Sequence, residues 1–229
     1  MRNGSRLEAF TDAAFAFALT LLAISGDEMP GSIAELKNAL HQIPSFIASA
    51  ALLIMFWHAH QSWSKDYRTD DGVSIVLTSV LVCTVLVYVY PLKMLFSGFF
   101  HWMTGGLLRA SYAASGPADI SDLFAIYGYG FITMCLAMFL LYRHTVHQAK
   151  KLGLTDEQKF LAAQHGFSFL LLMSPGVLSL ILTYTLPEKY LALNGMVYGL
   201  LGIIMPVYGV YSEKQYQAWR AARVNADNR

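Results

Sequence analysis

Charged residues are scarce in this sequence: aspartate, glutamate, lysine and arginine together make up 14% of its 229 residues. In a soluble domain about a quarter of the residues are charged. Hydrophobic residues account for 55% of the chain, and the mean hydropathy is +0.44. The formal net charge is only +1 and no basic run is present, so nothing indicates a nucleic-acid partner. The shortage of charge therefore indicates an integral membrane protein.

The sequence has only two cysteines, and it contains none of the common catalytic motifs. Cys83 and Cys135 both lie in apolar stretches, and two such residues are too few for a disulfide framework or a metal cage. HExxH, GxSxG and P-loop motifs are missing, and no pair of carboxylates lies within an apolar stretch. These absences argue against an enzyme and against a bound cofactor.

Long uncharged stretches are present instead, and they define the predicted fold. A membrane-spanning helix needs about 20 mostly apolar residues. The sequence predicts an all-α membrane protein, residues 1–229 forming one domain of six transmembrane helices. Their expected ranges are about 6–26, 42–64, 72–94, 121–143, 160–186 and 188–212. The polar connection 27–41 is expected to contain a short amphipathic turn, and the segment 93–121 to be the longest connection on its side of the membrane.

The basic residues indicate how the helices are oriented. If both termini are cytoplasmic, 12 of the 16 basic residues lie inside. The remaining four, Lys37, Lys93, Arg109 and Lys189, lie outside. Because lysine and arginine are enriched in cytoplasmic loops, this arrangement is the one that the sequence predicts.

The first helix is unusual because it carries charge at its start. Its uncharged part, residues 13–26, covers roughly 21 Å, which is less than the roughly 30 Å hydrocarbon thickness. Asp12 is therefore drawn toward the membrane and is expected to have a partner, and His60 of the second helix is one candidate. A cleaved signal peptide is the rival interpretation, but Glu8 and Asp12 argue against it.

One face of the first helix is a candidate pore wall. At about 100° per residue, Phe17, Thr20 and Ile24 lie within roughly 60° of one another, and Asp27 and Glu28 follow them outward. If several copies met on an axis, the acids would concentrate cations at an outer mouth, and the apolar rings would form a constriction. The same periodicity also fits a helix that packs its apolar face in a core.

Two glycine patterns call for an interpretation. Gly128-Tyr129-Gly130 is the tripeptide of potassium-channel filters, but it lies inside an uninterrupted apolar stretch and lacks the preceding Thr-Val. We interpret it as a site of close helix packing. Gly195, Gly199 and Gly202 in the sixth helix are assigned the same role.

The start of the chain resembles a known family. Arg6-x-x-x-Phe10-Thr11-Asp12 is similar to the RxxxFSD signature that opens the first helix in the transmembrane-protein-175 family of bacterial and endolysosomal potassium channels. The resemblance continues through the apolar run, through Pro-Ser-Phe at 44–46, and through Trp57-x-x-His60. The resemblance in sequence covers roughly residues 6–63. Over the rest of the chain, only the number of expected helices agrees with the family.

The resemblance implies a homotetramer of six-helix subunits in the cell membrane, expected to be a bacterial inner membrane. The first helix of each subunit would line the path of potassium ions, the only metal expected. Phe17, Thr20 and Ile24 match the family's pore-facing positions, and Phe17 stands where the family usually has Ile or Leu. The signature residues would instead pack helices together. They are Arg6, Phe10, Thr11, Asp12, Trp57 and His60.

The expected function is passive, potassium-preferring cation conduction without a GYG filter, through an apolar constriction and a threonine ring. The alternative is a proton-coupled secondary transporter in which Asp12 and His60 form the protonatable pair. A non-conducting membrane scaffold is the third hypothesis.

Overall fold

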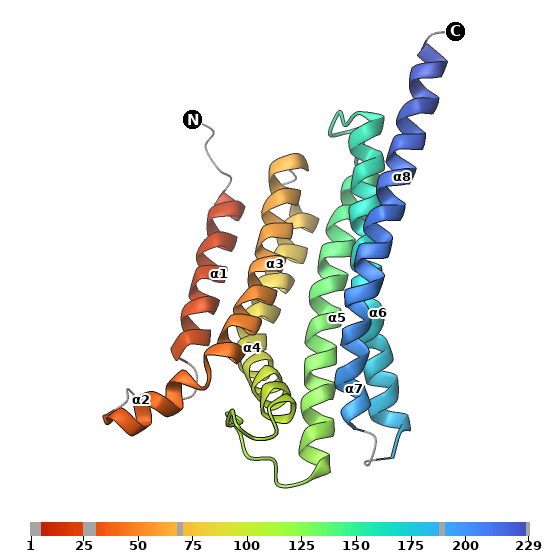
Figure 1. The fold of residues 1–229 in the computed structure, drawn as a ribbon. Coiled ribbons are helices and arrows are strands. Elements are labelled where there is room, and N and C mark those ends of the chain that lie inside the picture. The colour runs from red at the N-terminus through yellow and green to blue at the C-terminus, as the bar shows by residue number, and fades with distance from the viewer. Residues whose placement is uncertain (1–5, 25–30, 68–70, 188–190, 228–229) are drawn as a thin grey trace.

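The protein is a bundle of long helices (Figure 1). The computed structural model describes residues 6–24, 31–67, 71–187 and 191–227. Six of its helices are long and apolar enough to cross a membrane, as the sequence predicted. In chain order the elements are α1 (Arg6–Ile24), α2 (Ile33–Leu40), α3 (Ile43–Tyr67), α4 (Gly72–Met103), α5 (Pro117–His147), α6 (Asp156–Thr185), α7 (Ala192–Met196), the 3₁₀ helix η2 (Val197–Leu200) and α8 (Leu201–Asp227).

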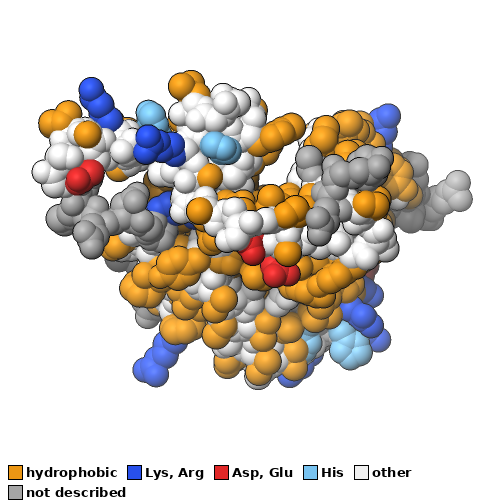
Figure 2. Space-filling view, turned by 90° about the horizontal axis from the view of Figure 1, so that it is seen from below, with side chains coloured by type: hydrophobic (Ala, Val, Ile, Leu, Met, Phe, Trp, Pro, Cys, Tyr) orange, Lys and Arg blue, Asp and Glu red, His pale blue; other side chains and the backbone are white. Residues whose placement is uncertain are grey.

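The start of α1 and the end of α8 lie at the same end of the bundle, which we call the terminal end (Figure 1). Seen from the opposite end, hydrophobic side chains cover broad areas of the surface, with few charged side chains among them (Figure 2). Large hydrophobic side chains are exposed elsewhere on the described helices as well, such as Val87 of α4 at 72% and Ile203 of α8 at 66% exposure. A surface of this kind is stable against lipid and not against water.

The helices form two groups that meet at α4 and α5. In the first group α1 packs against α3 and α4, and in the second α5 packs against α6, which in turn contacts α8 (Figure 1). Small residues allow the closest approaches. A side chain at Gly128 would lie 2.8 Å from Leu180 of α6, and one at Gly130 would overlap the ring of Tyr88 in α4. The Gly128-Tyr129-Gly130 tripeptide is thus helical and packs helices together, as the sequence analysis proposed.

The glycines of the last span behave differently. A side chain at Gly195 would begin 3.4 Å from the ring of Phe124, in line with close packing. At Gly199 and Gly202, the place where a side chain would begin has no atom of another described helix within 4 Å. The predicted close contact is therefore wrong for these two residues within one chain, because the exposed side of the span carries them.

Several element boundaries differ from those expected, most of all the end of α4 and the start of the last span. Helix α4 runs on to Met103, nine residues beyond the expected end, and includes Pro91 and the buried Lys93. The connection that follows is shorter as a result, and it is fastened by a hydrogen bond from the Ser111 N–H to Ser97 Oγ. The last span begins as α7 and η2 before α8 starts. The amphipathic turn expected in 27–41 is confirmed as the helix α2, for which Ser32 accepts a capping hydrogen bond.

Candidate ion-conducting helix

Helix α1 has two clearly different faces. The face that packs on α3 and α4 consists of four buried residues spaced four, three and four apart: Thr11, Phe15, Ala18 and Leu22. At about 100° per residue, this face lies about 160° away from the predicted pore stripe. The helix therefore has a face that it does not use within its own chain.

The predicted pore stripe lies on that unused face. Phe17 is 55% exposed and Ile24 is 68% exposed, with Thr20 exposed between them. The Thr20 hydroxyl donates a hydrogen bond to the Ala16 carbonyl at 3.0 Å. Because its proton is used in this way, the Thr20 oxygen keeps its lone pairs for a donor or a cation. In a bilayer, such a face meets lipid, another subunit or an ion path.

Asp12 has a definite partner on the next span. The indole N–H of Trp57 donates a hydrogen bond to Asp12 Oδ1 over 2.8 Å, and joins α1 to α3. Both side chains are half-buried. A hydrogen bond to a charged acceptor is about twice as strong as one between neutral groups. The hydrogen bond therefore offsets part of the free-energy cost of moving a carboxylate out of water to the edge of the hydrocarbon region.

His60 is bonded to a different helix. Its Nε2 lies 3.0 Å from the Thr78 hydroxyl of α4, and the side chain is 2% exposed. One turn further on, the indole of Trp63 donates to the Thr145 hydroxyl of α5 at 3.0 Å. Two polar contacts thus fasten α3 to its neighbours, and Asp12 and His60 do not share a hydrogen bond. Neither threonine was identified from the sequence, because no local pattern marks a partner 18 or 82 residues away.

The other signature residues have simpler surroundings. Arg6 and Phe10 are exposed at the start of α1. Thr11 is 1% exposed and donates to the Leu7 carbonyl within its own helix at 2.8 Å. The predicted outer-mouth residues, Asp27 and Glu28, lie outside the described residues. In the part of the chain that the structure describes, no three His, Cys, Asp or Glu side chains are grouped to hold a metal ion.

A further titratable contact lies at the terminal end, and the sequence analysis did not identify it. Asp71 caps α4 by accepting from the Ser74 N–H at 2.9 Å, and it also accepts from His144 of α5 and from Gln148, the residue that caps α5, at 2.6 Å each. Burial raises the pKa of the Asp71 carboxyl, but these hydrogen bonds outweigh burial and hold the pKa below its usual range. An N-capping Asp ahead of a long apolar run was the one available signal.

Comparisons with known proteins identify the family. The family model of the endosomal/lysosomal potassium channel TMEM175 matches residues 6–91. A protein of Marivirga tractuosa described as a potassium channel is 30% identical over 223 residues, which cover 93% of this chain and 90% of that protein. The chain belongs to the TMEM175 family.

The fold agrees with this assignment. The crystal structure of a variant of the TMEM175 channel MtTMEM175, in complex with a nanobody fusion protein, superposes with a TM-score of 0.80 at 28% identity. The match covers 93% of this chain and 97% of that one. The residues matched by the TMEM175 family model include all of α1 and α3 and most of α4. TMEM175 proteins are potassium channels and not enzymes, which agrees with the absence of catalytic motifs.

Proposed function

We propose that this TMEM175 protein conducts potassium passively as a homotetramer, in which one α1 helix from each subunit lines a central path. Phe17, Thr20 and Ile24 would face that path. The observation that carries the proposal is the division of α1 into a face buried on α3 and α4 and an opposite face that carries these three residues. A helix that were only a lipid anchor would need no hydroxyl on its exposed face.

The chemistry of the stripe suggests how conduction is controlled. Phe17 and Ile24 would form apolar rings, and a narrow apolar ring resists both water and a hydrated ion. Thr20 lies between them, and its oxygen would replace part of the hydration shell of a passing cation. A ring of four hydroxyls offers fewer oxygens than a filter lined by carbonyls. We therefore expect a modest preference for potassium over sodium.

Phe17 gives the constriction a particular character. Phenylalanine is bulkier than the Ile or Leu usual at this position, so four rings would narrow the path more. The faces of those rings are electronegative and attract cations. The rings would thus block the path when they point at the axis and would favour cations when they swing aside.

The signature residues would hold α1 in place without touching the ion. The hydrogen bond from Trp57 to Asp12 fixes the terminal end of α1 against α3, and the hydrogen bond between His60 and Thr78 fixes α3 against α4. Arg6, Phe10 and Thr11 belong to the same end of the helix. With the terminal end in the cytoplasm, Asp27 and Glu28 would follow the stripe at the outer mouth and attract cations there.

Cysteine accessibility tests which face of α1 meets the path. Cys83 is exposed and Cys135 is buried, so both are first replaced by serine. Thr20→Cys is then compared with Ala18→Cys, which lies on the buried face of the same helix. A water-soluble, positively charged methanethiosulfonate reagent is added during potassium-flux measurements in liposomes.

The proposal predicts that the reagent inhibits flux through the Thr20→Cys variant and leaves the Ala18→Cys variant unchanged. Potassium added in excess should slow the modification of Cys at position 20, because the ion and the reagent compete for one path. Equal and slow modification of both variants would show that the stripe faces lipid. Flux that requires a proton gradient would favour the transporter alternative.

A further inference from the structure

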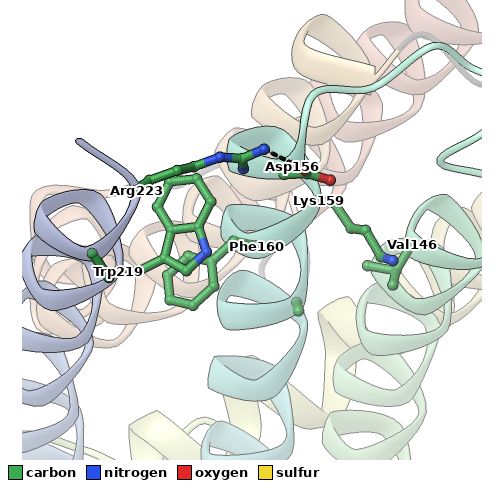
Figure 3. A pocket seen from close by; sticks show the side chains of 8 residues that line it. Val146, Asp156, Lys159, Phe160, Trp219 and Arg223 are labelled. Carbon is green, nitrogen blue, oxygen red and sulfur yellow. Dashed lines mark hydrogen bonds and ion pairs between the residues drawn. The ribbon is translucent and has the colours of Figure 1, made fainter. Parts of the chain in front are cut away.

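A pocket opens at the terminal end, well away from α1, between α5, α6 and α8 (Figure 3). Its volume is about 580 Å³. The inner wall is apolar and aromatic, formed by Val146, Phe160 and Trp219. Charged side chains stand at its edge, with Lys159 from α6 and Arg223 from α8. A pocket with an apolar wall and a cationic edge suits an amphiphile that carries a negative headgroup.

The aromatic wall and the arginine are held in place. Phe160 and Trp219 stack with ring centres 5.3 Å apart and planes 18° apart. The Arg223 guanidinium lies over the Trp219 ring at 5.1 Å and is paired with Asp156 (Figure 3). An arginine oriented by an aromatic face and one carboxylate retains N–H donors for a further anion, because guanidinium has five.

The height of the pocket in the bundle matches that of lipid headgroups. From Phe160 to the last residue of α6, Thr185, the helix covers about 39 Å at 1.5 Å per residue. The hydrocarbon core is about 30 Å thick, and a bilayer with its headgroups is about 40–45 Å. With Thr185 in the headgroup layer on the opposite side, Phe160 and the adjacent Trp219 would therefore lie at headgroup level. Tryptophan is enriched at this level of membrane proteins.

The charges at the pocket edge favour an anion. Lys159 and Arg223 are cationic, and Asp156 is the single carboxylate among the lining residues. Among the ion pairs of the described residues, Asp156 is bound by Arg223 and none involves Lys159. One positive charge is left without a counter-charge in the pocket.

We propose that this pocket binds an anionic phospholipid. Its phosphate would be held by Lys159 and Arg223, and its glycerol and upper acyl chain would lie against Phe160, Trp219 and Val146. The bound lipid would join α6 to α8 at the terminal end. This site is separate from the conduction proposal, and lipid binding is measured on the whole protein whether or not it conducts.

The test measures binding of a fluorescent phosphatidylglycerol to the purified full-length protein in neutral detergent. Phosphatidylcholine with the same acyl chains and fluorophore is the comparison lipid. Lys159→Gln removes one pocket cation and keeps the pair between Arg223 and Asp156. Lys214→Gln is the matched control, because Lys214 is an exposed cation of α8 that does not line the pocket. The melting temperature of each variant shows that it is folded.

We expect tighter binding of phosphatidylglycerol than of phosphatidylcholine, and a roughly fivefold weakening in Lys159→Gln with no change in Lys214→Gln. Equal weakening in the two variants would overturn the proposal, because it would reflect general surface charge. Equal affinity for the two lipids would also overturn it. Inorganic phosphate at millimolar concentration is the final arm: if it displaces the lipid completely, the pocket is a site for free phosphate and not for lipid.

Discussion

The hydrogen bond between Trp57 and Asp12 is predicted to hold α1 against α3. The 2.8 Å contact involves a charged acceptor and half-buried side chains. Hydrogen bonds to charged groups contribute about 1.5–3 kcal/mol in soluble proteins, whereas interhelical bonds in membranes have averaged about 0.6 kcal/mol with a maximum near 1.7. Since Asp12 lies near the charged end of α1, water competes for it. We expect a coupling energy of about 1 kcal/mol between the two side chains.

A double-mutant cycle isolates this coupling. Trp57→Phe, Asp12→Ala and the double variant are unfolded in increasing sodium dodecyl sulfate, and the loss of helix is followed by circular dichroism. Asp12→Asn retains an acceptor oxygen and should lose less stability than Asp12→Ala. Trp102→Phe is the matched control, because Trp102 is 61% exposed and removing its indole N–H should cost little.

Additive losses of stability would contradict a coupling between Trp57 and Asp12. If the double variant loses the sum of the two single losses, the contact contributes nothing to the fold. The same conclusion follows if Trp57→Phe costs no more than Trp102→Phe. A variant of Asp12 that changed ion selectivity while keeping stability would place Asp12 in the ion path.

Four further predictions follow from the same contacts. Phe17→Ala should raise single-channel conductance in planar bilayers by widening the constriction, and an unchanged conductance would place Phe17 elsewhere. Thr20→Val should lower the ratio of potassium to sodium permeability measured from reversal potentials, and an unaltered ratio would remove the hydroxyl ring from the account. Gly130→Ala should cost about 2 kcal/mol in detergent unfolding, because the added methyl overlaps the ring of Tyr88; full stability would contradict the packing. The lowered pKa of Asp71 contributes stability above the carboxyl's unfolded pKa of about 4, and that stability is lost as pH falls through the folded pKa. Thermal unfolding from pH 7 to pH 3 should therefore show a smaller loss in Asp71→Asn than in the wild type, and parallel curves would contradict this.

Helix positions were predictable because charge and hydropathy determine them directly. The extension of α4 was missed because the uncharged stretch stops just before Lys93, so the helix was expected to end one residue after it, whereas Lys93 is 8% exposed inside the helix. A lysine has a long apolar stem and is accommodated in a helix when its charged end finds a partner. Pro91 also lies within α4 and does not end it. From the sequence alone, a lysine or proline of this kind can either end a helix or lie within it. Tertiary packing decides which of the two occurs.

That Phe17, Thr20 and Ile24 share one face of α1 was predictable from helical periodicity, but their exposure was not, because the same periodicity fits a face packed in a core. The partner of His60 was not predictable either, because Thr78 is one of many hydroxyls in apolar stretches. The pocket at the terminal end was also out of reach, since Phe160 and Trp219 are 59 positions apart and neither belongs to a motif. Contacts between distant segments depend on how the helices are arranged in space. That arrangement cannot be read from a single sequence.

Passive conduction of potassium is measured directly as ion flux through the purified protein in liposomes. A potential is imposed with an ionophore, and potassium flux is compared with sodium flux in the presence and absence of a proton gradient. The account predicts electrogenic potassium flux that exceeds sodium flux and needs no proton gradient. No flux in folded, tetrameric protein, or flux only with a proton gradient, would contradict it.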